Sequence, residues 1–274
     1  MSLLKRFARS TAGIFGLLLL CIVILSAAFA PLFVSVGPFQ IVDTPFLPPL
    51  GSHLLGTDSL GRDVAVGLVY GARTSLLIGG LATMFAVAFG TLIGGLAGFY
   101  GGRVDNALMR VTEFFQTIPF FVFAIVIVAI LSPLLRNIVL AIGVVSWPPV
   151  ARLVRGECLS LRNREFVQAS VLLGRSDWEI MTRDILPNCA SPIIVTGSLM
   201  IATAILTESA LAFLGLSDPN LMSWGFMIAS GRTFLRSAWW LCAIPGTAIL
   251  LTVLSINLVG EGLNDAINPR LRES

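Results

Sequence analysis

The feature that most restricts the fold of this sequence is a series of six apolar segments, each near the length of a membrane span. They cover residues 12–34, 76–99, 114–134, 137–150, 192–214 and 239–260. A helix of about 20 residues crosses a hydrocarbon core of about 30 Å, and lipid admits only helices or closed barrels. The segments predict an all-α membrane protein with six transmembrane helices. The fourth is short and is expected to extend into its flanks or to tilt.

Composition agrees with a lipid environment and excludes several kinds of chemistry. Charged residues make up 12% of the 274 residues, against about 25% in a soluble domain. His53 is the single histidine and Lys5 the single lysine. A zinc motif of the HExxH type, a serine or cysteine triad and a phosphate-binding Walker lysine are therefore excluded. We expect no catalytic residue, metal or cofactor on this chain, so any ATP and Mg²⁺ would be bound by partner subunits.

The distribution of basic residues predicts the orientation of the chain in the membrane. Cytoplasmic loops are rich in Lys and Arg. With both termini inside, 13 of the 18 basic residues are cytoplasmic, and five are outside: Arg62, Arg73, Arg136, Arg232 and Arg236. The opposite orientation inverts this ratio. We therefore predict cytoplasmic N- and C-termini.

The N-terminal segment has an alternative interpretation as a signal peptide. Lys5 and Arg6 precede an apolar run, and Ala28-Phe29-Ala30 has the small-x-small pattern of a cleavage site. Cleavage there would place Pro31 directly after the scissile bond, and the apolar run is long for a signal peptide. A retained first helix is favoured.

The loop between the fourth and fifth segments, residues 151–190, is charged but patterned. Six arginines and five acidic residues lie between Arg152 and Asp184. This near balance favours docking to a protein over attraction to anionic lipid. The loop is predicted to form a helix-turn-helix with one apolar side, lined by Phe166, Ala169, Leu173 and Trp178. A solvated connector is the alternative.

Three positions predict how this loop turns. Gly174 suits a turn that needs positive φ or a close backbone approach. Ser176 or Asp177 is expected to cap the next short helix, which should end before Pro187 because proline lacks a backbone donor.

Glycines of the second segment predict a helix-packing seam. Gly90, Gly94 and Gly98 recur at intervals of four residues, and small residues on one face let helices approach closely in lipid. Packing within the chain is favoured over a subunit interface. Further on, Arg110 and Glu113 are spaced to form an ion pair.

The charged loop also resembles the coupling loop of bacterial ABC-importer permeases, in which Glu-Ala-Ala is followed after three residues by Gly and about a dozen residues later by Leu-Pro. Here Gln168, Ala169 and Ser170 occupy the first three positions, followed by Gly174 and by the Leu-Pro pair at 186–187. Gln168 stands where the general motif has Glu, and Ser170 where it has Ala. Further matching stretches are 55–63 (LGTDSLGRD), 70–76 (YGARTSL), 208–216 (ESALAFLGL), 223–225 (SWG), 257–263 (NLVGEGL) and 268–270 (NPR).

From residue 55 onward the chain resembles the C-type permease subunit of bacterial dipeptide, oligopeptide, nickel and glutathione importers. The resemblance implies the type I ABC importer permease fold and half of a translocation path in the inner membrane, with no nucleic-acid partner. It also implies a homologous second permease subunit, two ATPase subunits and an extracytoplasmic substrate-binding protein. Di- or oligopeptides are the favoured cargo, with nickel chelates, glutathione or another small solute as alternatives. The residues expected to couple to the ATPase are Arg162, Arg164, Glu165, Phe166, Gln168, Ala169, Gly174, Trp178, Leu186 and Pro187.

Two further sites are expected outside this loop. The proline-rich outer segment, residues 35–72, either contacts the binding protein or forms a lid over helix ends. Candidate contacts for the binding protein are Asp58, Arg62, Asp63 and Trp224. Glu208 lies in the fifth segment, where a carboxylate needs a partner or water; it either serves a gate or substrate path or makes a structural hydrogen bond.

The expected organisation is a cytoplasmic N-terminus with the first helix (1–34), the outer segment (35–72), the importer transmembrane domain (73–264) and a cytoplasmic tail (265–274). A secondary transporter or channel is the competing class. It should show inverted repeats or charges deep in several helices, whereas the membrane-depth segments here are nearly uncharged apart from Glu208. An intramembrane enzyme would need a catalytic pair, and the sequence has neither Gly-x-Ser-x-Gly nor a second histidine.

Overall fold

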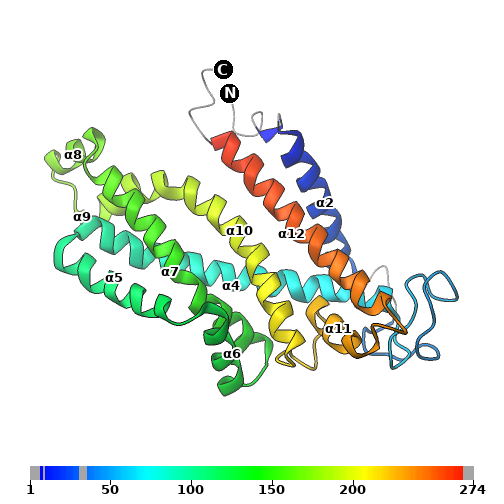
Figure 1. The fold of residues 1–274 in the computed structure, drawn as a ribbon. Helices are drawn as coiled ribbons and strands as arrows, with labels where there is room; N and C mark the ends of the chain where they lie inside the picture. The colour runs from blue at the N-terminus through cyan, green and yellow to red at the C-terminus, as the bar shows by residue number, and fades with distance from the viewer. Residues whose placement is uncertain (1–6, 9, 31–35, 268–274) are drawn as a thin grey trace.

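The computed structural model describes residues 7–8, 10–30 and 36–267, and the regular elements in this part of the chain are all helical (Figure 1). In chain order they are α2 (Thr11–Ala28), α4 (Val64–Tyr100), α5 (Gly102–Thr117), α6 (Phe120–Leu131), α7 (Leu135–Arg162), α8 (Glu165–Leu172), α9 (Asp177–Glu179), the π-helix η1 (Ile180–Ile185), α10 (Leu186–Phe213), α11 (Trp224–Gly231), the 3₁₀-helix η2 (Arg232–Phe234) and α12 (Trp240–Ile267).

The prediction of an α-helical membrane protein with six apolar segments is confirmed, with one correction. Five helical stretches of the described chain are long and apolar enough to cross a membrane, and a sixth candidate consists of α5 and α6, bent by 84°. The segment predicted at 114–134 is therefore not one unbroken helix. The helix breaks at Ile118, whose backbone is extended (φ −85°, ψ 127°). Ile118 directly precedes Pro119, and a proline disfavours helical backbone at the residue before it. The helix before this bend begins at Gly102, earlier than the predicted start near Arg110.

Two other boundaries differ from the predicted segments. α4 begins at Val64 because the Asp63 carboxylate accepts the backbone N–H groups of Ala65 (2.7 Å) and Val66 (3.3 Å), which stabilises an earlier helix start. The last part of the predicted outer segment is thus helical. The short fourth segment extends at its C-terminal end to Arg162, as expected. Residues 31–34 of the first predicted segment lie outside the described residues.

The glycine seam packs α4 against α7 within the chain, as favoured from the sequence. A Cβ atom added at Gly90, Gly94 or Gly98 would lie 2.2–2.6 Å from atoms of α7. The closest of these approaches is between Gly94 and the carbonyl oxygen of Ala151. The two helix backbones are therefore in close contact along about two turns of α4.

The remaining long helices complete a bundle with a loop projecting from one end. α2 lies beside α12, and α10 contacts α4, α7 and α12, so α10 joins the two halves of the bundle (Figure 1). All four cysteines are free. Two of them, Cys158 on α7 and Cys189 on α10, are buried with their Sγ atoms 3.9 Å apart.

Candidate functional site

The charged loop between α7 and α10 has the predicted helix-turn-helix form. α8 follows α7 after a short break, and α9 begins the helical stretch that continues through η1 into α10. In Figure 1, α8 projects past the ends of the neighbouring long helices. The loop is therefore a folded extension of two spans.

Gly174 ends α8 in a Schellman motif. Its φ is +73°, its N–H donates to the Val171 carbonyl (2.9 Å), and the N–H of Arg175 donates to the Ser170 carbonyl (3.2 Å). A Cβ at Gly174 would have no atom within 4 Å. Of the two reasons that the sequence offered for this glycine, positive φ applies and a close backbone approach does not.

Ser176, rather than Asp177, caps the second helix of the loop. The Glu179 N–H donates to the Ser176 hydroxyl (3.4 Å), and the Ser176 N–H donates back to the Glu179 carboxylate (3.3 Å), which forms a capping box. The prediction that this helix ends before Pro187 is wrong. The π-helix η1 leads directly into α10, where Pro187 occupies the first turn and its missing N–H costs no hydrogen bond.

The loop exposes several large apolar side chains. The exposed fraction is 88% for Leu172, 77% for Leu173 and 62% for Trp178, and Phe166 and Val171 are also exposed. We call these five side chains the α8 apolar surface. Val167 and Ser170 lie on the buried side of α8, and Val167 packs with Ile180 and Val154 beneath it. The sequence indicated Phe166, Leu173 and Trp178 but missed Val171 and Leu172.

The polar residues predicted for coupling surround this surface, whereas the Leu-Pro pair does not. Arg162, Arg164, Glu165 and Gln168 are exposed, as is Ala169. A groove of about 270 Å³ runs under α8 and is lined by Arg162, Gln168, Val171, Asp177 and Tyr100, among others.

Leu186 and Pro187 lie apart from this surface. Leu186 is half-buried against the cluster that contains Cys158 and Cys189, while Pro187 is exposed in the first turn of α10. Leu186 therefore packs beneath the loop and is not part of its exposed face.

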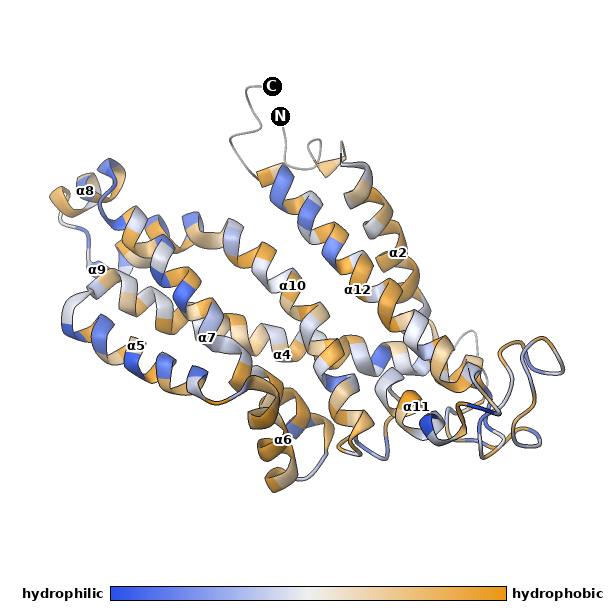
Figure 2. Ribbon diagram, in the orientation of Figure 1, coloured by the Kyte–Doolittle hydropathy of each residue, from blue (hydrophilic) through white to orange (hydrophobic). Residues whose placement is uncertain are grey.

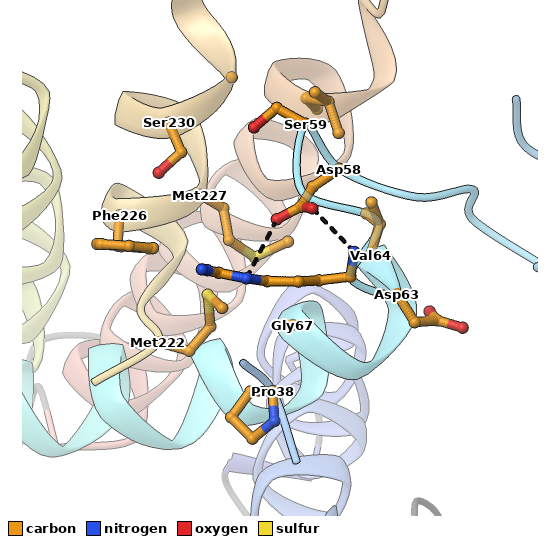
Figure 3. A pocket seen from close by; sticks show the side chains of 13 residues that line it. Pro38, Asp58, Ser59, Asp63, Val64, Gly67, Met222, Phe226, Met227 and Ser230 are labelled. Atoms are coloured by element: carbon orange, nitrogen blue, oxygen red, sulfur yellow. Dashed lines mark hydrogen bonds and ion pairs between the residues drawn. The ribbon is translucent and has the colours of Figure 1, made fainter. Parts of the chain in front are cut away.

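In the outer segment, the predicted contact residues stabilise local structure. Asp58 accepts the N–H groups of Leu60 (2.8 Å) and Arg62 (2.9 Å), and the Arg62 guanidinium lies over the Phe39 ring (5.1 Å). Figure 3 shows the small cavity between Asp58, Met222 and Phe226, with the Asp63 carboxylate pointing away from Phe226. The cavity has a volume of about 30 Å³, which is too small for a dipeptide.

The single histidine joins two carboxylates in this segment. His53 Nδ1 lies 2.7 Å from Asp63, and Nε2 lies 3.4 Å from Asp43. The backbone N–H of Thr44, followed by the interaction with His53, lowers the pKa of Asp43. This link could not be predicted from the sequence because its three members are up to 20 residues apart.

Trp224 cannot serve as a surface contact, which corrects its predicted role. It is 1% exposed, its indole N–H donates to the Leu68 carbonyl (2.9 Å), and its backbone N–H donates to the Ser75 hydroxyl (3.2 Å). These bonds fix the start of α11 on α4. The most exposed apolar residues of the outer segment are instead Leu50 (85%), Leu54 and Ile41.

Glu208 makes the structural hydrogen bond that was one of its two interpretations. Its side chain is 2% exposed, and the Ser223 hydroxyl donates to it at 2.7 Å. The bond joins α10 to the cap of α11, since Ser223 also accepts the N–H of Phe226 (3.0 Å).

Comparisons with known proteins place the chain in a family. The family model described as "binding-protein-dependent transport system inner membrane component" matches residues 90–273, and that described as "N-terminal TM domain of oligopeptide transport permease C" matches residues 2–49. A di/tripeptide transport system permease protein of Pseudomonas aeruginosa is 41% identical, with 98% of this chain and 92% of the relative covered. An oligopeptide transport system permease protein of Bacillus subtilis is 37% identical, with 98% and 88% covered.

A solved structure supports the fold. An inward-facing structure of the MetNI methionine ABC transporter matches with a TM-score of 0.59 and 16% identity, covering 73% of this chain and 96% of the other. This likeness shows the fold, and the family models and the relatives show the family. The chain belongs to the family of binding-protein-dependent transport system inner membrane components, as a multi-pass permease subunit of the C-type dipeptide and oligopeptide branch of ABC importers.

Proposed function

We propose that this permease imports di- or oligopeptides across a bacterial inner membrane as half of a translocation path. The relatives that cover nearly its full length are named as di/tripeptide, dipeptide and oligopeptide permeases, which supports a peptide cargo. A homologous second permease would supply the other half of the path. Nickel chelates and glutathione remain the alternative cargoes.

The α8 apolar surface is the docking site for an ATPase subunit in this proposal. The single observation that carries it is a folded helix-turn-helix with five large apolar side chains exposed at one end of a membrane bundle. A soluble partner that covers these side chains gains the free energy of burying them. The charged residues Arg162, Arg164 and Glu165 at its edge would give polar contacts and orientation.

We infer the remaining partners and the orientation from this assignment. Docking to a cytoplasmic ATPase puts the loop and both termini in the cytoplasm, in agreement with the excess of basic residues on that side. ATP and Mg²⁺ would bind to two partner ATPase subunits, and closure of the ATPase dimer would move α8. The outer segment, through Leu50, Leu54 and Ile41, would then meet an extracytoplasmic binding protein.

The docking proposal is tested by Leu172→Asp, with Leu172→Met as the matched control. Leu172 is 88% exposed and contributes little to the core, so neither change should affect the amount of folded protein. We expect Leu172→Asp to lower dipeptide uptake at least tenfold and to abolish the stimulation of ATP hydrolysis by loaded binding protein. Leu172→Met should behave as wild type. Normal stimulation in the Asp variant would refute docking at α8.

The cargo is tested separately by uptake of labelled dipeptide, nickel ion and glutathione in cells with and without this chain. Loss of dipeptide uptake alone on deletion would support the peptide assignment. Loss of nickel or glutathione uptake with normal dipeptide uptake would replace it and leave the docking assignment intact.

A further inference from the structure

α5 has three distinct sides, although it is only 16 residues long. One side is buried and contains Asp105 and Thr112. A second side is exposed and apolar, with Val104, Val111 and Phe114. The third side is exposed and polar. Successive helix residues turn by about 100°, which places the polar residues within an arc of about 80°; they are Arg103, Asn106, Arg110, Glu113 and Thr117. We call this third side the α5 polar flank.

Contacts on the buried side fix how α5 lies in the bundle. Near its start, Asp105 accepts two bonds from Arg155 of α7, at 2.5 and 2.6 Å. Near its end, the Phe115 ring lies 5.3 Å from that of Trp147, two turns earlier on α7. α5 therefore runs antiparallel to α7. Figure 2 shows its blue and orange turns, in contrast to the uniformly orange α6.

These contacts also fix the depth of the polar flank. The rings of Phe115 and Phe89 both contact Trp147, at 5.3 and 5.1 Å, so Phe115 lies at the level of Phe89. Phe89 is in the middle of the apolar run 76–99 of α4. At a rise of 1.5 Å per residue, Glu113 is about 3 Å from this level and Arg110 about 8 Å. Both charges are therefore within the depth of the membrane.

Within the described residues, neither Arg110 nor Glu113 has an ion-pair partner, and they do not pair with each other as their spacing had suggested. Lipid is the wrong surrounding for such a side, since charged side chains at membrane depth face a bundle interior or a water-filled cavity. The exposed apolar side of α5, with Val104, Val111 and Phe114, does not need water or a charged partner. The two exposed sides of α5 thus call for two different surroundings.

We propose that the α5 polar flank lines the aqueous path of the importer and that Arg110 and Glu113 meet the charged ends of a zwitterionic peptide. The two residues are three apart, with Cβ atoms about 5–6 Å from each other. They offer one positive and one negative group on the same face, which complements a peptide with a free carboxylate and a free amino group. The peptide part of this inference rests on the proposed cargo, while the aqueous lining does not.

The lining is tested by thiol accessibility in the intact importer, in inside-out membrane vesicles. Single cysteines are placed at Asn106, Glu113 and Thr117 on the polar flank and at Val111 and Phe114 on the apolar flank, after the four native cysteines are replaced. We expect a charged, membrane-impermeant methanethiosulfonate to modify the polar-flank cysteines at least tenfold faster. Equal or reversed rates would overturn the lining and indicate that another protein or lipid covers this side.

The role of charge is tested at one position with two reagents of similar size. Glu113→Cys importer is labelled in detergent with a sulfonate or a trimethylammonium methanethiosulfonate and then reconstituted for dipeptide uptake. We expect the sulfonate, which restores a negative charge, to leave at least threefold more uptake, and Arg110→Cys to show the opposite preference. Equal uptake would overturn the charge role. If wild-type importer takes up no dipeptide, the cargo proposal fails, while the accessibility pattern still decides the lining.

Discussion

At the scale of single residues, Gly174 shows how a backbone angle alone can determine a residue type. Its φ of +73° is strained for most side chains, yet the space around it is open. Asn tolerates this conformation better than other non-glycine residues, and β-branched Val tolerates it poorly. We expect Gly174→Asn to keep dipeptide uptake within about threefold of wild type and Gly174→Val to lose at least tenfold.

Uptake per membrane-inserted permease, measured by immunoblotting of membranes, is the readout for this pair. Equal losses in both variants would mean that the size of the side chain matters at Gly174 and not its backbone angle.

Gly174 was predictable from its spacing, whereas the burial of Trp224 was not. Trp224 was predicted to contact the binding protein, and only the packing of α11 on α4 shows that its N–H groups donate to Leu68 and Ser75.

At the scale of elements, the α4–α7 seam gives the most direct stability test. A Cβ at Gly94 would lie 2.2 Å from the Ala151 carbonyl oxygen, while Gly80 on the same helix has no atom within 4 Å. We expect Gly94→Ala to destabilise the protein by about 1–3 kcal/mol through overpacking. Gly80→Ala should be neutral or stabilising by up to about 1 kcal/mol, because alanine favours helix.

Thermal unfolding of the purified permease in detergent compares the two alanine variants. A lower midpoint for Gly80→Ala than for Gly94→Ala would contradict the seam.

The seam itself was predictable because its signal is local: three glycines at intervals of four residues. The first part of α5 was not predicted, because a search for apolar runs does not detect a helix that has one polar flank. The bend at Pro119 had a local signal as well, since a proline disfavours helical backbone at the residue before it.

At the scale of the whole molecule, the two ends of the charged loop between α7 and α10 lie close together. Cys158 on α7 and Cys189 on α10 enclose the loop, and their buried Sγ atoms are 3.9 Å apart. A copper–phenanthroline oxidant should link them, because the sulfur atoms must approach only to about 2.05 Å. We expect a chain cleaved by protease in the exposed loop to remain joined on a non-reducing gel, with uptake by the uncleaved, oxidised importer within about twofold of normal.

Cys158→Ala is the control for this link, since it should release two fragments after the same treatment. Complete loss of uptake on oxidation of the wild type, with no loss in the control, would show that α7 and α10 must separate during transport.

The fold class and the position of the loop were predictable from the sequence. The closure of its base was not, because it depends on the meeting of two residues 31 positions apart.

This closed base has a mechanical consequence. A force applied to α8 enters α7 at Arg162 and reaches α10 through the continuous η1 helix, so one displacement is delivered to two spans at once. If an ATPase docks on α8 as proposed, a loop open at its base would bend by itself, and part of the ATPase movement would not reach the two spans. In the proposed importer, the closed base would instead move α7 and α10 together.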